Sequence, residues 1–483
     1  MGKAVVLSDV SPHKVMAGEN QRALLFKKDS VESLTQALTK LITQPDERAR
    51  LGQAAREWIE KERTWNFVTN NYHHALQRVL NSQQGTAKPT VAKSLDQITL
   101  GLIADQFTTD TLASGVNVVK LTPENWQQEL ADQPIDALFV ESAWKGNDWV
   151  WHRRVGFYGE EEFAPLRALL AHCRSQGIPS LFWNKEDPVH FDRFRKAASL
   201  CDHVFTTDSR RIIPYLTTPG ALTQSVSSCA FYASPKIHNL LPSKRAWQPT
   251  AAYGGTYYGK RYPERTEYMD KIMSAAAPLG LTIYDRQHDD PESPYKYPGG
   301  LGSYVAGSLS YEEMIEAYKA HPVQINVNSV LDSPTMFSRR VMEAAACGAP
   351  IISGPALGMN RYLEAAGHVV RTEADAAQAL ENLMHHDAYR WRVALKGARA
   401  VMRAHTTQTR LTQMLRTAGM VVKAPELPSI KLYCETVSVV AADNLVDQTI
   451  LPSHIVASHW LPGAKELLQE IGITCQEASG ALA

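Results

Sequence analysis

The sequence lacks the features that mark several large classes of protein. Its 483 residues include 50 Lys plus Arg and 50 Asp plus Glu, so the formal net charge is zero and no nucleic-acid footprint appears. The six cysteines lie far apart without a C-x-x-C pair, which argues against a disulfide framework and a zinc site. No apolar run approaches the roughly 18 residues of a membrane span, and the first residues lack the apolar stretch of a signal peptide. We therefore expect a cytoplasmic protein with reduced thiols and without bound metal or nucleic acid.

The length and three polar, proline-containing stretches predict several domains. A single core stops growing beyond roughly 250 to 300 residues, and the stretches begin at Asn81, Ser234 and Val421. The predicted parts are a partial α/β segment (1–85), a first domain (97–240), a second domain (246–420) and a C-terminal extension (421–483).

Short apolar runs alternate with helical patterns in both central parts, which is typical of parallel sheets with crossover helices. The predicted strands are "ITLGLIA", "VNVVKL", "DALFVES", "PSLFW" and "HVFTTD" in the first domain, and "LTIYD", "VQINVNSV", "APIISG" and "HVVRT" in the second. The fold class is therefore α/β with two Rossmann-like domains. Such sheets bind ligands at the carboxyl ends of their strands, so a cleft between the domains is the expected site.

The amino-terminal part repeats the pattern of the second domain's back half. "GKAVVLSD" from Gly2 is similar to "GAPIISG" from Gly348, and an Arg-rich amphipathic helix follows in both places. Because a half-unit cannot bury both faces of its sheet, we expect this segment either to pack on the main body or to represent part of a tandem enzyme. Alternatively, any strand-helix-helix run would look alike.

The stretch "SPTMFSRRVMEAAACGAPIISG" from Ser333 carries the first candidate site. Ser333 suits a helix N-cap and Pro334 the first helical position, so a helix is predicted to begin there. A helix amino terminus reinforced by Arg339 or Arg340 suits a diphosphate, and Glu343 would accept hydrogen bonds from ribose hydroxyls. The alternative is a surface ion pair between Arg339 and Glu343.

A glycine pair in "YGGTYYGKRYPER" is a second phosphate candidate. Gly254 and Gly255 follow a predicted strand, and the absence of side chains lets backbone N–H groups approach an anion. Lys260, Arg261 and Arg265 add positive charge nearby. The alternative is an ordinary glycine turn, since the pair matches no dinucleotide or P-loop fingerprint.

Two polar loops follow strands of the first domain and carry candidates for acceptor chemistry. In "LFWNKEDPVHF", Glu186, Asp187 and His190 come directly after an apolar strand, where a base or an acceptor partner is expected. The alternative for Asp187 is helix capping ahead of Pro188. The other loop, "VESAWKGNDWVWHRR", holds three tryptophans that would either stack on a sugar or pack in the core.

Together these motifs resemble the CgeB-like (spore maturation protein B type) glycosyltransferases. The resemblance covers residues from about 97 to 420 through "FWNKEDPVHF", "GGTYYGKRYPER", "IYDR", "INVNSVLDSPTMFSRRVMEAAACGAPIIS" and "RTEADAAQAL". It implies the GT-B fold and hexosyl transfer from a nucleotide-sugar to a glycan or glycoconjugate. The amino-terminal part resembles the end of a group 1 glycosyltransferase, and the tail faintly resembles the start of a group 2 enzyme.

The resemblance also implies roles for individual residues. Glu343 matches the second glutamate of the group 1 donor motif, whereas Thr335 stands where the first would be, a departure that bears on donor-sugar contacts and on stereochemistry. Gly255 and Arg261 fall where the family holds the diphosphate. Asp285, with the arginine after it, would frame the base.

The implied reaction is a retaining, metal-independent transfer in polysaccharide biosynthesis. No cofactor is expected beyond the donor substrate, linked to UDP, GDP or dTDP. Helix amino ends and arginines would stabilise the departing diphosphate, and the loop after "LFW" would hold the acceptor hydroxyl. Two alternatives stay open: a catalytically silent nucleotide-sugar or glycan-binding subunit, and a sugar-nucleotide epimerase. Product analysis distinguishes them.

Overall fold

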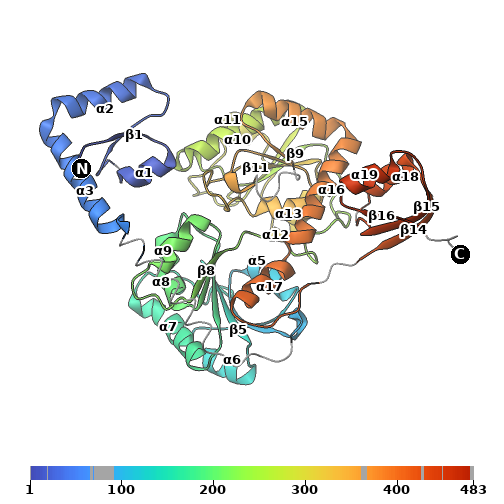
Figure 1. Ribbon diagram of the computed structural model, residues 1–483, viewed down its shortest axis with the longest axis horizontal. Coiled ribbons are helices and arrows are strands. Elements are labelled where there is room, and N and C mark those ends of the chain that lie inside the picture. The colour runs from blue at the N-terminus through green and yellow to red at the C-terminus, as the bar shows by residue number, and fades with distance from the viewer. Residues whose placement is uncertain are drawn as a thin grey trace. The chain divides into compact units, whose positions relative to one another are not determined.

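The computed structural model describes residues 2–18, 20–65, 69, 92–359, 367–425, 429–448 and 450–478. The chain divides into two compact units, Met1–Thr86 and Ala87–Ala483 (Figure 1). The polar stretch from residue 81, one of the predicted boundaries, lies largely outside the described residues.

The first sheet of the larger unit has six parallel strands in the order β4-β3-β5-β6-β7-β8. Its strands are β3 (Thr99–Ile103), β4 (Asn117–Lys120), β5 (Ala137–Glu141), β6 (Ser180–Asn184), β7 (His203–Thr206) and β8 (Ser225–Ser228). Five of them match predicted strands. The sixth, β8, was missed because "SVSS" has neither an apolar run nor clear alternation. The strand order reverses beside β3, which creates the crevice where open α/β sheets bind ligands.

Helices cover both faces of this sheet (Figure 1). They are α5 (Gln106–Ala113), α6 (Trp126–Asp132), α7 (Glu160–Ser175), α8 (Phe191–Leu200), α9 (Ile212–Leu216) and, from the end of the second domain, α17 (Thr407–Thr417). The chain returns to the first domain at α17, where the Thr407 N–H donates to the Ala233 carbonyl. Leu411 of α17 shares one buried apolar cluster with Leu100 of β3. Because this cluster also contains Val341 and Ile351, the two domains share part of one core.

The second sheet has five parallel strands in the order β10-β9-β11-β12-β13. Its elements are β9 (Ala251–Gly255), α10 (Pro263–Ala276), β10 (Leu281–Asp285), α11 (Gly299–Gly302), α12 (Tyr311–Ala320), β11 (Val323–Asn326), α13 (Arg340–Ala346), β12 (Ile351–Ser353), β13 (Gly367–Val369), α15 (Glu373–His385) and α16 (Asp387–Ala404). α12 begins with a capping box, in which Ser310 accepts from the Glu313 N–H and Glu313 accepts from the Ser310 N–H. The two parallel sheets that we predicted for the Rossmann-like domains are therefore confirmed.

The last described part of the larger unit is a small parallel sheet in the order β14-β15-β16. It comprises β14 (Lys431–Val437), α18 (Val439–Val446), β15 (His454–Trp460), α19 (Ala464–Glu470) and β16 (Thr474–Glu477). Arg392 of α16 pairs with Asp443, and Arg399 donates to two backbone carbonyls at the end of α18. The tail is thus a folded βαβαβ module joined to α16 by these arginines.

The smaller unit holds a two-stranded parallel sheet and three described helices: β1 (Val6–Ser8), α1 (Ser11–Ala17), β2 (Leu24–Phe26), α2 (Val31–Thr43) and α3 (Pro45–Glu62). The lengths of α2 and α3, 13 and 18 residues, equal those of α15 and α16. β1 pairs with β2 in parallel, as β12 pairs with β13 in the second domain. α2 begins at the capping hydroxyl of Ser30, and α15 begins at that of Thr372. This agreement in element order and length extends the sequence similarity from which we predicted a repeat.

Candidate active site

A cavity of about 300 Å³ lies at the carboxyl ends of the strands of both Rossmann-like sheets. Residues that follow β6 line one wall, and residues that follow β9 and β11 or begin α13 line the other. The lining residues are Lys185, Glu186, Val189, His190, Phe231, Gly255, Thr256, Tyr258, Tyr262, Arg265, Arg286, Val327–Val330 and Met336–Arg340. Two Rossmann-like domains that share such a cavity form the GT-B arrangement.

Arg340 and Arg265 make the second domain's wall cationic. Arg340 donates to the Gly254 carbonyl at the end of β9, and its guanidinium lies 4.9 Å from the ring centroid of Tyr253. Arg265 donates to the Thr256 carbonyl (3.1 Å) and to the Tyr253 hydroxyl (2.6 Å). These bonds hold both charges in place before a ligand binds, so an anion does not have to order them.

Thr256 adds an unsatisfied hydroxyl to this wall. Its side chain is 2% exposed, and its Oγ1 has no hydrogen-bond partner among the described residues. A buried hydroxyl without a partner costs free energy that a ligand oxygen would recover. The preceding Gly255 has no room for a side chain, because a Cβ there would lie 2.7 Å from the Tyr253 hydroxyl and 3.2 Å from Nη2 of Arg340.

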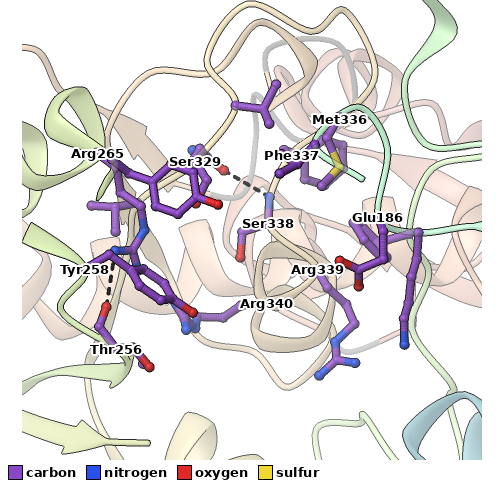
Figure 2. Close-up of a pocket in the computed structure, with 18 of the residues that line it drawn as sticks. Glu186, Thr256, Tyr258, Arg265, Ser329, Met336, Phe337, Ser338, Arg339 and Arg340 are labelled. Atoms are coloured by element: carbon purple, nitrogen blue, oxygen red, sulfur yellow. Dashed lines mark hydrogen bonds between the residues drawn. The ribbon is translucent and has the colours of Figure 1, made fainter. Parts of the chain in front are cut away.

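Arg339 points to the opposite side of the cavity. Figure 2 shows Arg340 reaching toward Tyr258 and Thr256, whereas Arg339 extends toward the side of Glu186. Its guanidinium lies 3.2 Å from the ring centroid of Phe107 in α5, and Nε lies 3.0 Å from a Glu343 oxygen. The two successive arginines therefore serve different walls of one cavity.

The helix that carries these arginines begins later than predicted. α13 begins at Arg340, not after Ser333. The Ser333 hydroxyl accepts from the Met336 N–H (3.0 Å) and caps only a local turn. Asn328, after β11, accepts from the Ser338 N–H (2.9 Å) and fixes the approach to the helix. The predicted helix is wrong over these residues because contacts with the first domain hold them in a non-helical loop.

Thr335 makes those contacts. Its hydroxyl donates to the Thr207 carbonyl (2.7 Å) and accepts from the Ser209 N–H (2.8 Å), both in the first domain. Nearby, Arg210 pairs with Asp332 at 2.9 Å. Thr335 is 1% exposed and does not line the cavity. The residue that departs from the family motif thus joins the two domains.

Glu186 and His190 form the opposite wall, on the loop after β6. Burial raises the pKa of Glu186, although Lys185 and a hydrogen bond from Trp144 oppose the shift. Burial lowers the pKa of His190, assisted by Arg261 and Arg193. The Glu186 carboxyl therefore keeps its proton to a higher pH than an ordinary glutamate, and the neutral form of the His190 imidazole is favoured, so both are candidates for accepting a proton.

Lys185 anchors this loop in a buried charge cluster. Its Nζ lies 3.0 Å from both Asp105 and Glu141, two residues that follow or end strands of the first sheet. Burial and the Asp105 charge raise the pKa of Glu141, whereas the two carboxylates outweigh the effect of burial and raise the pKa of Lys185. Asp105 also accepts from three backbone N–H groups, including that of Gly146. The cluster holds Lys185 in place and thereby restricts the position of the next residue, Glu186.

Asp187 lies in the core beneath the cavity. The side chain is fully buried, does not line the cavity, and accepts from Asn184 (3.0 Å), Thr206 (2.6 Å) and Tyr215 (2.9 Å). These bonds tie the loop to β6, β7 and α9. The geometry therefore gives Asp187 a positioning role, distinct from the proton transfer that we predicted for it.

We expect Asp187 to make folding stability depend on pH. Burial raises its pKa to about 7, against about 3.9 in an unfolded chain. The native state therefore binds this proton more tightly, so the stabilisation is present below about pH 4 and is lost as pH rises through about 7. The difference corresponds to about 4 kcal/mol. Denaturant titrations at pH 4 to 8 should show a smaller loss of stability with pH in Asp187→Asn, and equal slopes would contradict the assignment.

Glu343 is 1% exposed and is already paired within the protein. It accepts from the Tyr311 hydroxyl (2.9 Å) and pairs with Arg339, while His238 lies 3.8 Å away. Burial opposes ionisation, but Arg339, His238 and Tyr311 outweigh it and lower the pKa of Glu343. In the pair that we weighed as a surface ion pair, Glu343 is thus buried whereas Arg339 is 29% exposed, and Glu343 orients Arg339 at the cavity wall.

The remaining sequence candidates lie beside the cavity. Gly254 presents its carbonyl to Arg340, and Asp285, 3% exposed, ends β10. Arg261 extends to the Tyr295 hydroxyl (2.9 Å) outside the lining residues. Of the tryptophans, Trp151 is fully buried and belongs to the core, whereas Trp149 is 57% exposed. The structure therefore brings together Glu186, His190, Gly255, Arg339 and Arg340 from our candidate set.

Sequence reasoning missed Thr256, Tyr258 and Asn328 as parts of the site. Thr256 directly follows the glycine pair, and Asn328 follows β11 within "INVNSV". Because both residues come just after a strand, where α/β sheets bind ligands, their positions could have identified them as site residues.

The second domain carries a recognisable family pattern. Residues 256–416 match a family model described as glycosyl transferase-like. This segment begins at Thr256 of the cavity and ends in α17. It covers one wall of the site and a third of the chain. No curated protein matches the sequence.

Three solved structures illustrate the similarity of fold. A sucrose-phosphate synthase from Thermosynechococcus elongatus is 14% identical, with 61% of this chain and 76% of that chain covered and a TM-score of 0.36. Anabaena Alr3699/HepE, in complex with UDP and glucose, is 14% identical, with 72% and 95% covered and a TM-score of 0.40. A trehalose 6-phosphate synthase from Burkholderia multivorans is 12% identical, with 62% and 75% covered and a TM-score of 0.39. All three scores lie below 0.5, and the function proposed below rests on the residues of the site.

In the described part of the chain, none of the helices combines the length and apolar character that a membrane span requires. None of the clusters of His, Cys, Asp or Glu side chains in that part has an arrangement that holds a metal ion.

Proposed function

We propose that the protein is a glycosyltransferase that moves a hexose from a nucleotide-sugar to a glycan or glycoconjugate. The observation that carries this proposal is the division of the cavity into a wall with fixed arginines and a wall with one carboxylate and one imidazole. The family match over residues 256–416 supports the same reaction class.

The cationic wall suits the diphosphate of the donor. Arg265 and Arg340 form this wall, Arg286 of the same domain also lines the cavity, and the Thr256 hydroxyl offers a further hydrogen bond. As the bond between the anomeric carbon and the phosphate oxygen breaks, negative charge grows on the leaving nucleoside diphosphate. Charges already fixed by Tyr253 and by the backbone at the end of β9 stabilise that growth without reorganisation.

The opposite wall suits the acceptor. Among the described residues, Glu186 supplies the one carboxylate that lines the cavity. It would accept the proton of the acceptor hydroxyl while the acceptor oxygen forms its bond to the anomeric carbon. The products are the glycosylated acceptor, the nucleoside diphosphate and one proton on Glu186, which passes to water. His190 is the second group able to take this proton.

Metal independence and retention complete the proposal. Four arginines at the cavity supply the positive charge that a divalent cation supplies in other transferases. A double displacement needs a second carboxylate as nucleophile, so we propose that retention proceeds by front-face attack, with the acceptor hydroxyl entering between Glu186 and the departing diphosphate.

Nucleotide release tests the function directly. The purified chain is incubated with UDP-, GDP- and dTDP-hexoses, with and without cell-surface glycan extract and with and without EDTA. We expect acceptor-dependent release of one nucleotide, unaffected by EDTA, and a product whose anomeric configuration by NMR equals that of the donor. Binding without release would favour a silent subunit, and sugar conversion without release would favour an epimerase.

A further inference from the structure

A second cavity lies on the second Rossmann-like domain, at the carboxyl end of α13. Its volume is about 330 Å³, within the range of small-molecule sites. It is lined by Leu240–Ser243 and Trp247, by Tyr318, Lys319, His321 and Pro322, by Cys347, Gly348 and Pro350, and by Asp387, Arg390, Trp391 and Ala394. None of these residues takes part in the reaction proposed above.

Helix α13 separates the two cavities. Arg339 and Arg340 line the first cavity at the start of the helix, whereas Cys347 and Gly348 line the second just after its end. The seven helical residues span roughly 10 Å. A ligand in the second cavity is therefore too far from the first to be a reactant there.

Two exposed indoles border the second cavity. Trp247 is 54% exposed and Trp391 44%, whereas Trp151 and Trp183 are fully buried in the first domain. Exposed indole surface is costly in water, and indoles that line a cavity gain free energy when a ligand covers them. Trp391 lies on one face of α16 with three other residues that line the cavity, Asp387, Arg390 and Ala394.

The charged groups at this cavity are fixed in place. Arg390 donates to the Leu383 (3.1 Å) and Met384 (3.2 Å) carbonyls, and its guanidinium lies 5.6 Å from the ring centroid of Trp247. Its Nη2 also lies 2.7 Å from Asp387, whose side chain is 86% exposed. Lys319 donates to the Asn239 side chain at 3.2 Å. Ordered hydrogen-bonding groups at fixed positions reduce the entropy cost of binding a polar ligand.

The buried lining is aromatic and aliphatic. Tyr318 and His321 direct their polar atoms into the protein, to Glu343 (3.4 Å) and to Tyr284 (3.0 Å), and so offer mainly ring surface. Such a lining, with indoles and charged groups beside it, matches a molecule with apolar faces and hydroxyl edges. Pyranose rings have that character, because their C–H faces suit the indoles and their hydroxyls suit Lys319, Arg390 and Asp387.

We propose that this second cavity is a saccharide-binding site. Trp247 and Trp391 stack on the C–H faces of a pyranose, and Lys319, Arg390 and Asp387 bind its hydroxyl or carboxylate groups. With two cationic groups and one anionic group, the site favours neutral or acidic sugars over amino sugars with a free ammonium. It would hold a glycan independently of the transfer site, through residues that the reaction does not use.

Titration of the full chain with defined saccharides tests the proposal. The probes are six-unit oligomers of glucose, N-acetylglucosamine and galacturonate at up to about 10 mM, and the signals are tryptophan fluorescence and calorimetric heat. We expect saturable binding of at least one probe, weakened at least about tenfold by Trp391→Ala and by Trp247→Ala. Trp65→Ala, which removes an indole 85% exposed in the smaller unit, should leave that affinity unchanged.

A parallel titration with UDP, GDP and dTDP separates this proposal from the transferase proposal. Trp391→Ala should bind nucleotide as the parent chain does, and Arg340→Ala should bind saccharide as the parent chain does. If no probe binds saturably, or if Arg340→Ala weakens saccharide binding and the tryptophan variants do not, the saccharide site is refuted. If the parent chain binds saccharide but none of the three nucleotides, the transferase proposal is refuted and the saccharide site is not.

Discussion

Arg340→Ala should weaken nucleoside diphosphate binding by at least about 100-fold. The guanidinium is partly buried, fixed to the Gly254 carbonyl and set at the wall that lacks a carboxylate. Removing one member of a desolvated charge pair costs about 2 to 5 kcal/mol, and 2.8 kcal/mol corresponds to about 100-fold in affinity. Calorimetric titration with UDP, GDP and dTDP measures the change, and far-UV circular dichroism verifies that the variant is folded.

Arg261→Ala is the matched control. Arg261 lies after β9, whose end accepts the hydrogen bond from Arg340, and the family resemblance implied a diphosphate role for it, but its guanidinium bonds to Tyr295 outside the cavity lining. An exposed cation contributes little to binding, so we expect less than about a threefold change. A large loss in Arg261→Ala with an unaffected Arg340→Ala would place the diphosphate elsewhere and refute the cationic wall.

Glu186→Gln should lower transfer by about 10²- to 10⁴-fold while leaving nucleotide affinity unchanged. General bases contribute factors of this size, and the substitution preserves shape while removing the proton acceptor. Because burial raises the pKa of Glu186, we expect the parent rate to fall as pH drops through a value above the ordinary carboxyl range. The variant should lack that acidic limb. Initial rates of nucleotide release from pH 5 to 9 provide both measurements.

Asp192→Asn controls for the loss of a carboxylate in the same region. Its side chain is 86% exposed in the first turn of α8, so rate and pH profile should match the parent chain. If Glu186→Gln keeps the parent rate and His190→Ala loses it, the imidazole is the base. In that event the pH limb should lie below the ordinary histidine pKa, because burial lowers the pKa of His190.

Most of the fold could be predicted because it depends on local pattern. Buried parallel strands such as β5 and β6 are continuous apolar runs in the sequence. The start of α12 is marked by the capping box of Ser310 and Glu313. The start of α13 could not be predicted in this way. Ser333 and Pro334 fit the local rules for a helix start, but bonds between Thr335 and both Thr207 and Ser209, far away in sequence, hold the segment in a non-helical loop.

The candidate site was predictable to the level of the loop, not of the side chain. Glu186, Asp187 and His190 lie on one short loop, yet only the first and last line the cavity, because Asp187 bonds to Thr206 and Tyr215 beneath it. Glu343 likewise lies within one helical turn of Arg339 but is enclosed by two tyrosines. Sequence spacing identifies which residues are near a site, whereas burial decides which of them meet the ligand.

The fixed arginine wall also bears on how fast a donor arrives. The chain is neutral overall, so the positive cavity is balanced by acidic groups elsewhere on the molecule. A nucleotide-sugar in solution therefore encounters a potential gradient that points toward the site, with its strongest field over the last several ångströms. Salt shortens the reach of that field to about 8 Å at physiological ionic strength. Encounter should consequently slow as salt rises, while the shielded contacts within the wall, once formed, are much less affected.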